Sequence, residues 1–400
     1  PVGTAGGPPG ESGAGEAGAE RPGGATRGRG DTLRFLVPAE AVPAPEAEDA
    51  PSRSLVGALG RKLLKVLVFK LTDPVLGAVS DAFAGRWEAR NRPYRLRTVA
   101  PDDFRTPGAG ELDASAWPTL RAGRALLLLH GTFSTTHGAF AGLPGDTVRA
   151  LWERYGGRVL GLDHFTLSHD PRRNAAWLLD RLPGDGRLEV DVLCHSRGGL
   201  VARTLAEGGP AFGLDTSRLQ VRRVVFVGVP NRGTVLADPD HMVTFLDRYT
   251  SVLNLFPAGP VSEVLEGIIT AVKMVGRGAL GGLDGLAAMR PDGPFLRALN
   301  AGPPPEADYF AVAADYEPVD AGLRALVTGT VRDAVADRVF QDVANDLVVP
   351  EPGVWDDNGA AGFPIPAERT LRLPPGEGVV HTTLFGHPGT GERLTRWLTA

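Results

Sequence analysis

The sequence predicts an α/β fold with a mostly parallel central sheet, helices on both faces and a helical cap insertion. Three observations lead to this prediction. From residue 94 onward, apolar runs of strand length alternate with segments of helical spacing. The run Ala125–Leu129 is apolar at every position, as expected of a strand that is buried on both faces. A helix-rich block over residues 236–300 interrupts the alternation.

The individual strands and helices are predicted from these patterns in chain order. Strands are expected over residues 95–99, 125–129, 158–162, 188–193, 221–229, 308–313 and 370–373. Helices are expected over residues 147–155, 174–181 and 199–207, with a last helix that ends near Leu398. Parallel strands need crossover connections, and the predicted helices supply them.

The block over residues 236–300 is predicted to be a cap over the ligand site. It contains apolar segments of helical spacing at 242–255 and 261–275 and no clear strand. It follows the end of a strand, where open α/β sheets place their ligands. The alternative is an insertion that only thickens the fold.

The N-terminal part of the chain is predicted to be different from the rest. Residues 1–30 contain eleven glycines and no apolar cluster, so we expect residues 1–52 to be a disordered segment and linker. The folded domain is then expected over residues 53–400. Residues 55–71 have apolar residues at helical spacing with basic residues between them, which predicts a helix that packs on the core or contacts a membrane surface.

Composition excludes several classes of function. The net charge is −5, which argues against nucleic acid as the main partner, because phosphate-binding domains carry a basic excess. Cys194 is the only cysteine, so we expect no internal disulfide and a cytoplasmic location. Secretion stays open, because the chain starts at Pro1 and an upstream segment would not be seen. The apolar runs are far shorter than a membrane-spanning helix.

A serine at a strand-to-helix turn is the central motif. Residues 192–200 (VLCHSRGGL) follow a predicted strand and open a predicted helix. In this context a tight turn lifts the Ser196 hydroxyl off the end of the sheet as a nucleophile. The turn needs small residues two before and two after the serine. Gly198 satisfies the second position, and Cys194 stands at the first.

A second motif is predicted to supply an oxyanion hole. The strand at residues 125–129 ends in His130-Gly131-Thr132. Acyl transfer needs backbone N–H groups aimed at the developing oxyanion. We expect these donors to be the N–H groups of Thr132 and Arg197, with His130 as a brace for the loop.

Together with Gly-Val-Pro-Asn-Arg-Gly-Thr at residues 228–234, these motifs resemble the α/β-hydrolase superfamily, and within it the bacterial lipases and esterases. The resemblance covers residues 94–398. It implies the α/β-hydrolase fold and a Ser-His-Asp triad that cleaves carboxylic esters through an acyl-enzyme without a cofactor. The implied partner is a small-molecule or lipid ester.

The triad acid and base are expected after the nucleophile in chain order. Asp346 lies in the sequence ANDLVVP, which resembles the Asn-Asp-Gly-x-Val turn of similar lipases except that Leu347 replaces the glycine. Asp315 is the alternative acid. His381 is the expected base because it follows the last predicted strand, and His387 is the alternative.

Other polar residues near the predicted site are expected to be structural. Asp163 and His164 follow a strand on the same edge, and without companion ligands at metal spacing they are expected to fix their loop. We give His195 no part in proton transfer. The triad alone does not separate an esterase from an acyltransferase or an amide or lactone hydrolase, and a non-catalytic binding module is a further alternative.

Overall fold

The computed structural model describes residues 81–184, 186–237, 283–316, 343–357 and 359–399, together with His241 and four two-residue strands nearer the N-terminus. These strands pair as β1 (Thr32–Leu33) with β4 (Phe69–Lys70) and β2 (Val37–Pro38) with β3 (Leu63–Leu64). β1 and β2 fall within the segment predicted to be disordered, and the rest of that segment lies outside the described residues.

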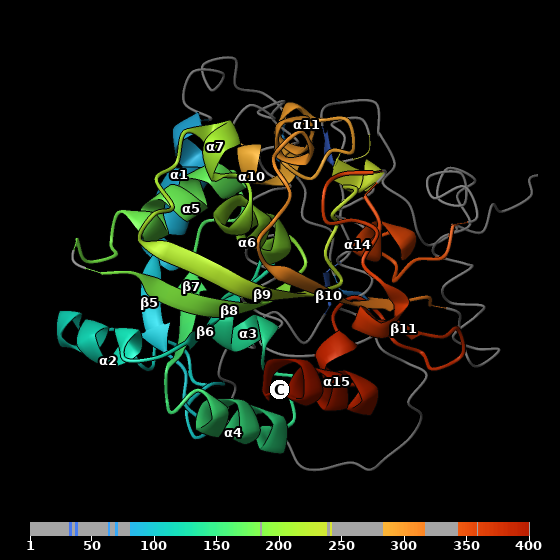
Figure 1. The fold of residues 1–400 in the computed structure, drawn as a ribbon. Helices are drawn as coiled ribbons and strands as arrows, with labels where there is room; N and C mark the ends of the chain where they lie inside the picture. The colour runs from blue at the N-terminus through green and yellow to red at the C-terminus, as the bar shows by residue number, and fades with distance from the viewer. Residues whose placement is uncertain are drawn as a thin grey trace, which may run out of the picture.

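A seven-stranded sheet forms the centre of the molecule, in the order β11-β10-β9-β8-β6-β7-β5 (Figure 1). All neighbouring strands are parallel except β5 and β7, which are antiparallel. The strands are β5 (Arg95–Thr98), β6 (Ala125–Leu129), β7 (Val159–Asp163), β8 (Leu188–His195), β9 (Leu219–Val227), β10 (Asp308–Ala314) and β11 (Thr370–Leu373). Each predicted strand is therefore present, with its ends within two residues of the prediction.

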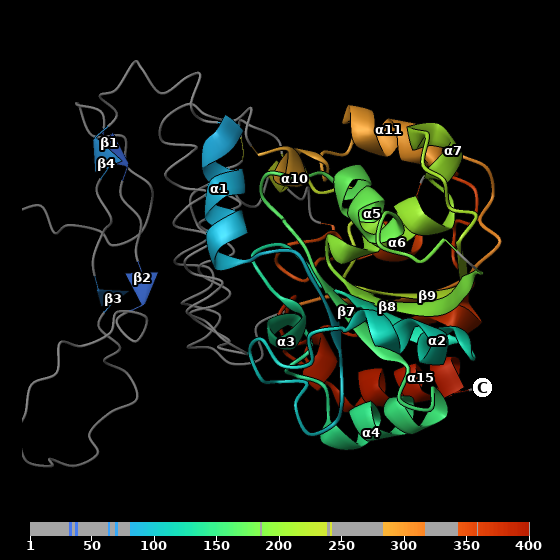
Figure 2. The ribbon, with the colours of Figure 1, turned by 90° about the vertical axis from the view of Figure 1, so that its left-hand side faces the viewer.

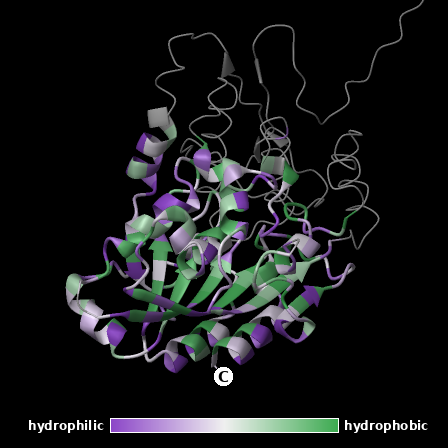
Figure 3. Ribbon diagram, turned by 45° about the horizontal axis from the view of Figure 1, so that its top comes forward, coloured by the Kyte–Doolittle hydropathy of each residue, from purple (hydrophilic) through white to green (hydrophobic). Residues whose placement is uncertain are grey.

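Helices cover both faces of the sheet (Figures 1 and 2). The long ones are α1 (Asp81–Asn91), α4 (Gly145–Arg154), α5 (Pro171–Leu179), α6 (Gly198–Ala206) and α15 (Pro388–Thr399). Leu127 and Leu129 pack in one core cluster with residues of α5 and α6, whereas Leu126 and Leu128 pack in a second cluster with residues of α4 and α15. The alternation follows from the period of two in a strand, and Figure 3 shows the resulting apolar strands between helices with polar outer sides.

The helices predicted over residues 147–155, 174–181 and 199–207 and the last helix are present, and capping explains where one of them differs. α5 begins at Pro171, three residues before the predicted start. Asp170 caps it by accepting a hydrogen bond from the Arg173 N–H group, and proline suits the first helical position. The 11-residue helix α1 was not predicted. Helices of seven residues or fewer were not predicted either, because they are too short to show a period; they are α2 (Trp117–Arg121), α3 (Thr136–Ala139), α7 (Gly209–Phe212), α10 (Asp284–Ala287), α11 (Pro294–Asn300) and α14 (Pro352–Trp355).

The predicted cap is described only at its C-terminal end. α10 and α11 lie in this part, and Leu286, Leu296 and Leu299 belong to the main core cluster. The segments 242–255 and 261–275 lie outside the described residues, so the cap over residues 236–300 stays a prediction.

The helix predicted over residues 55–71 is wrong at β3 and β4, which are strands within that range. A run such as LLKVLVFK is apolar at nearly every position, and such a run fits a strand as well as a helix. The other residues of 55–71 lie outside the described part of the chain. Among the described helices, none combines the length and the apolar character that crossing a membrane requires.

Strand order and direction together give the α/β-hydrolase fold that the sequence predicted. The first strand of the sheet, β5, runs antiparallel to its neighbour, and all later strands are joined through crossovers into a parallel sheet. β8, which carries the serine motif at its carboxyl end, lies in the middle of the sheet between β6 and β9.

Candidate active site

Ser196 lies in the tight turn between β8 and α6. Its backbone φ is +52°, a left-handed conformation that is uncommon outside glycine and that a nucleophile elbow imposes. Gly198 is required because a Cβ atom there would lie 2.3 Å from the Leu129 carbonyl oxygen. Cys194 is fully buried, and its thiol donates to the Val225 carbonyl oxygen at 3.3 Å. Cysteine therefore fits the position where the motif has glycine.

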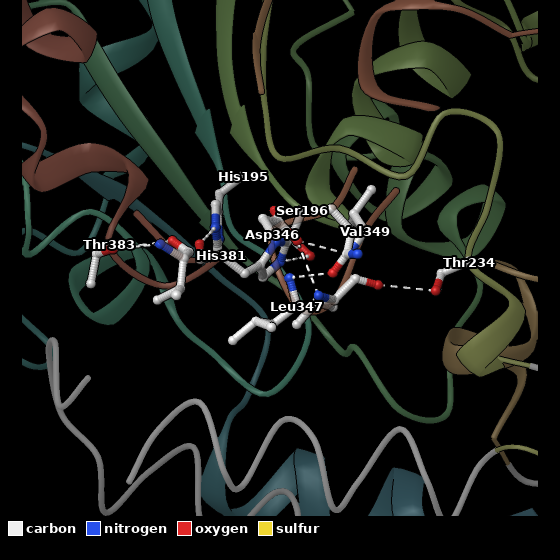
Figure 4. A network of polar contacts seen from close by, with 11 residues as sticks. His195, Ser196, Thr234, Asp346, Leu347, Val349, His381 and Thr383 are labelled. Atoms are coloured by element: carbon white, nitrogen blue, oxygen red, sulfur yellow. Dashed lines mark hydrogen bonds and ion pairs between the residues drawn. The ribbon is translucent and has the colours of Figure 1, made fainter. Parts of the chain in front are cut away.

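His381 and Asp346 lie next to Ser196, although they come from separate loops (Figure 4). Nε2 of His381 lies 2.9 Å from the Ser196 hydroxyl oxygen. Nδ1 of His381 lies 2.7 Å from Oδ2 of Asp346. The three residues are at most 3 % exposed. The fold thus joins a hydroxyl, an imidazole and a carboxylate in one buried hydrogen-bonded line.

The loop around Asp346 is shaped by its own carboxylate. Oδ1 accepts hydrogen bonds from the N–H groups of Val348 at 3.1 Å and Val349 at 2.7 Å, which leaves Oδ2 for the imidazole. Leu347 has a φ of +76°. Thr234, at the end of the motif over residues 228–234, donates its hydroxyl hydrogen to the Val348 carbonyl oxygen at 3.0 Å. The motif therefore supports the acid loop.

The alternative acid and base have other contacts. The Asp315 N–H group donates to the Leu373 carbonyl oxygen at 3.1 Å, at the end of β10. Nε2 of His387 lies 2.8 Å from Oε2 of Glu377, and its Nδ1 accepts from the Gly389 N–H group at 3.1 Å. The structure thus brings Asp346 and His381, rather than Asp315 and His387, to the serine.

Thr132 follows a glycine that packs against the serine. The preceding residue, Gly131, packs so tightly that a Cβ atom there would lie 2.6 Å from Cβ of Ser196. This approach brings the backbone after Gly131 close to Ser196. Thr132 is buried, and its hydroxyl contacts Sδ of Met289 at 3.9 Å. Its N–H group as an oxyanion donor stays a prediction.

Arg197, the other predicted donor, buries its whole side chain. Its guanidinium donates to the Gly285 carbonyl oxygen at 2.7 Å, to Oδ1 of Asn174 at 3.0 Å and to the His169 carbonyl oxygen. Burial lowers the pKa of Arg197 to about 10, so the group is still charged at neutral pH. These contacts hold the side chain away from Ser196, and the predicted role of Arg197 uses only its backbone N–H group.

Two histidines beside the site are braces. Nε2 of His130 accepts from the His164 N–H group at 3.0 Å, and its Nδ1 donates to the Gly131 carbonyl oxygen at 3.0 Å. Nε2 of His195 donates to the His381 carbonyl oxygen at 3.0 Å. Burial lowers the pKa of His130 to about 4 and that of His195 to about 3. Both rings are therefore neutral at physiological pH.

Asp163 and His164 take the loop role that was expected of them. Oδ1 of Asp163 accepts from the Thr136 N–H group at 2.6 Å. Nδ1 of His164 donates to the Leu162 carbonyl oxygen at 3.2 Å. Among the described residues, no three His, Cys, Asp or Glu side chains are grouped so that they could hold a metal ion.

Sequence reasoning missed Glu88 on α1. Its buried carboxylate accepts hydrogen bonds from residues 166–168, which follow β7. The sequence around a single glutamate in an 11-residue helix does not show that its side chain is buried. The burial results from contacts with a segment about 80 residues away along the chain.

Comparisons with known proteins give a family and a set of similar folds. No curated protein matches the chain. The mature lipase BlEst2 of Bacillus licheniformis is 18% identical over 69% of this chain and 92% of its own, with a TM-score of 0.38. Lipase 1 from Pelosinus fermentans is 13% identical over 69% and 96%, with a TM-score of 0.43. The enol-lactonase from Burkholderia xenovorans LB400 is 13% identical over 77% and 96%, with a TM-score of 0.37.

A family model described as a domain of unknown function, DUF7379, matches residues 91–399. The match includes every strand of the central sheet together with Ser196, Asp346 and His381. Because it spans most of the sequence, the chain belongs to the DUF7379 family.

Proposed function

We propose that the chain is a serine hydrolase that cleaves carboxylic esters, with Ser196 as nucleophile, His381 as base and Asp346 as the acid of a triad. One observation carries the proposal: the buried line from Oδ2 of Asp346 through the imidazole of His381 to the Ser196 hydroxyl, with separations of 2.7 and 2.9 Å. In this line each group has the partner that acyl transfer needs.

The hydrogen-bond directions define the proton path. A carboxylate only accepts, so Nδ1 of His381 donates to Asp346 and Nε2 carries the lone pair. Nε2 then accepts the hydroxyl hydrogen of Ser196 and takes this proton as the oxygen attacks the ester carbonyl. Asp346 stabilises the imidazolium that forms, and its own orientation is fixed by two backbone N–H groups.

The rest of the cycle follows from the same groups. The N–H groups of Thr132 and Arg197 receive the oxyanion, where one such donor contributes about 10²- to 10³-fold to kcat. His381 then protonates the leaving alcohol, which leaves an acyl group on Ser196. Water, activated by His381, attacks this ester and releases the acid. The substrate is a small-molecule or lipid ester, and the steps need only side chains, backbone and water.

Hydrolysis of p-nitrophenyl esters of short and long acyl chains tests the proposal. Ser196→Ala and His381→Ala are expected to lose turnover, and Asp346→Asn to lose about 10⁴-fold in kcat, because the histidine loses the partner that sets its tautomer. His387→Ala and Asp315→Asn are the matched controls, and both are expected to keep the parent's turnover.

Labelling with a fluorophosphonate separates the remaining outcomes. A parent that labels at Ser196 but turns over no p-nitrophenyl ester has a reactive serine and a narrower substrate. A parent that neither turns over nor labels is a binding module, and the hydrolase proposal is then wrong. Equal loss in His387→Ala and His381→Ala contradicts the assignment of the base.

A further inference from the structure

Glu88 fills an anion site that the backbone after β7 forms. Its Oε1 accepts from the N–H groups of Thr166 at 2.6 Å and Leu167 at 2.9 Å. Its Oε2 accepts from the Ser168 N–H group at 3.0 Å and the Ser168 hydroxyl at 2.6 Å. Glu88 is 1 % exposed. Three successive N–H groups that converge on one carboxylate depend on it for their partners, so the loop keeps this shape only with Glu88 in place.

The loop over residues 164–169, which we call the brace loop, contacts the residue that follows one predicted oxyanion donor. Oγ1 of Thr166 accepts from the Phe133 N–H group at 3.3 Å. Phe133 directly follows Thr132, is fully buried and has a φ of +58°. A bulky residue holds such a conformation only when its surroundings fix it, and the Thr166 hydroxyl is one of the groups that do so.

The brace loop also contacts the residue that carries the other predicted donor. The His169 carbonyl oxygen accepts from the Arg197 guanidinium. The Leu167 carbonyl oxygen accepts from the Gly285 N–H group at 2.8 Å, and the Gly285 carbonyl oxygen accepts from Nε of Arg197 at 2.7 Å. The residue that follows one predicted donor and the side chain of the residue that carries the other are thus both hydrogen-bonded to this short loop.

We infer that Glu88 is a positioning residue for the oxyanion hole and acts through the brace loop on Thr132 and Arg197. This inference rests on the proposed function. Glu88 itself contacts backbone and the Ser168 hydroxyl, so it acts on the donors and not on the substrate. It lies on α1, ahead of residues 91–399 that match the family model. The catalytic unit therefore includes a helix outside the matched region.

Kinetics of variants in the full chain test the inference. Glu88→Gln replaces one acceptor oxygen by an NH₂ group. Whichever way the amide is turned, this NH₂ group faces an N–H donor of the brace loop. Thr166→Val removes the acceptor of the Phe133 N–H group. We expect each variant to lose about tenfold in kcat, less than deletion of a whole oxyanion donor, with an unchanged KM and pH profile. Because both substitutions act through one path, the loss of kcat in the double variant is expected not to exceed the larger of the two single losses.

Asp191→Asn is the matched control for lost stability. Asp191 is also a carboxylate that is 1 % exposed, and it accepts from the Tyr155 hydroxyl at 2.6 Å. It lies earlier in β8 than the serine turn and contacts neither the brace loop nor the triad in the described structure. We expect this variant to melt at a lower temperature but to keep kcat per fluorophosphonate-titrated serine. An equal loss of kcat in Asp191→Asn overturns the inference.

Hydrogen exchange gives a readout that needs no substrate. The Phe133 amide is expected to exchange faster in Glu88→Gln than in the parent and at the parent's rate in Asp191→Asn. Unchanged exchange at Phe133 in Glu88→Gln overturns the inference, whatever kcat does. If the parent neither turns over esters nor labels, the proposed function fails, and exchange still decides whether Glu88 fixes this loop.

Discussion

His195 donates a hydrogen bond from Nε2 to the backbone carbonyl oxygen of His381 at 3.0 Å. The residue before the proposed nucleophile therefore holds the loop that carries the proposed base. A carbonyl oxygen can only accept, so the proton of the neutral His195 ring is on Nε2. Burial lowers the pKa of His195 to about 3, which keeps this arrangement at every pH at which the base would work.

Loss of this bond is expected to reduce catalysis without loss of the fold. His195→Ala leaves the His381 carbonyl without this donor, and a hydrogen bond of about 1 kcal/mol corresponds to roughly fivefold in kcat. His195→Gln places an amide N–H group near the position of Nε2 and is expected to keep most of the activity. Steady-state kinetics of both variants check this. Full kcat in His195→Ala shows that the contact does not position the base.

Gly228 packs against the histidine and the acid, so a methyl group there should separate them. Its φ is +58°, and a Cβ atom would lie 2.7 Å from Cδ1 of Leu384, 3.2 Å from Nδ1 of His381 and 3.3 Å from Oδ2 of Asp346. Gly228→Ala is expected to lose at least about tenfold in kcat, since a misplaced triad loses its hydrogen bonds.

Gly359→Ala is the control for backbone strain alone. Gly359 has a φ of +89°, and a Cβ atom there would have no other atom within 4 Å among the described residues. Both variants are expected to lose about 1 kcal/mol in free energy of unfolding from the left-handed conformation. Gly228→Ala should lose more, because its methyl group also displaces Leu384, and only this variant should lose kcat. Urea unfolding and ester hydrolysis measure the two effects separately. Equal kcat in the two variants contradicts the role of Gly228.

The sequence was sufficient to predict the sheet and the serine turn, because both have local signals. Strands buried on both faces are apolar at every position, as in Ala125–Leu129, and the structure gives these bounds unchanged. Ser196 was found because a strand, a tight turn and a helix follow one another in the chain.

Other features had no local signal. Asp346 and Asp315 both follow β10, and only the three-dimensional contact to the imidazole separates them. His381 and His387 lie in the same loop region, but the short turn η8 (Leu384–Gly386) lies between them, and His387 pairs with Glu377. Glu88 was missed because its partners are about 80 residues away along the chain.

Leu347 offers a test of backbone strain in the acid loop. Its φ of +76° lies in the region that favours glycine. Leu347→Ala and Leu347→Gly both remove the half-buried side chain, but only alanine keeps a Cβ atom. We expect the glycine variant to be more stable by about 1 kcal/mol, although glycine lowers stability at ordinary positions. Urea unfolding of the two variants checks the order, and an alanine variant that is equally stable contradicts it.

The buried histidines predict how stability depends on pH. An unfolded histidine titrates near 6.5, whereas burial lowers the pKa of His130 to about 4 and that of His195 to about 3. Below pH of about 6.5 the unfolded chain binds protons that the folded chain rejects. The free energy of unfolding is therefore highest above that pH and falls toward pH of about 4, by up to roughly 1.4 kcal/mol per pH unit for each such histidine.

Urea unfolding over this pH range measures the slope. His130→Asn removes one of the titrating groups while its amide keeps a donor near the position of Nδ1. We expect the variant to show a smaller decrease between pH of about 6.5 and 4 than the parent does. A free energy of unfolding that stays level in the parent over the same range shows that these rings accept protons in the folded state.

A buried ion pair far from the serine separates stability from catalysis. Arg203 on α6 is fully buried. It donates from Nη1 to Oδ2 of Asp357 at 2.8 Å and from Nε to Oε1 of Glu207, which is also buried. Asn300 bridges the two, accepting from Nη2 of Arg203 and donating to Oδ1 of Asp357, each at 3.0 Å. A guanidinium in this position is stable only while its carboxylate partners are present.

Asp357→Ala is therefore expected to lower the free energy of unfolding by about 2–3 kcal/mol, because it leaves a buried guanidinium donor without its acceptor while Glu207 still balances the charge. The neighbouring pair of Asp356 and Arg232 is 2.7 Å apart but partly exposed, at 29% and 34%. Asp356→Ala is expected to cost at most about 1 kcal/mol, since solvent screens such a pair. Urea unfolding gives both values, and kcat per titrated serine should stay at the parent's level in both variants. If the two variants lose similar free energies of unfolding, the remaining partners of Arg203 are sufficient to stabilise its buried charge, and the prediction for Asp357 is wrong.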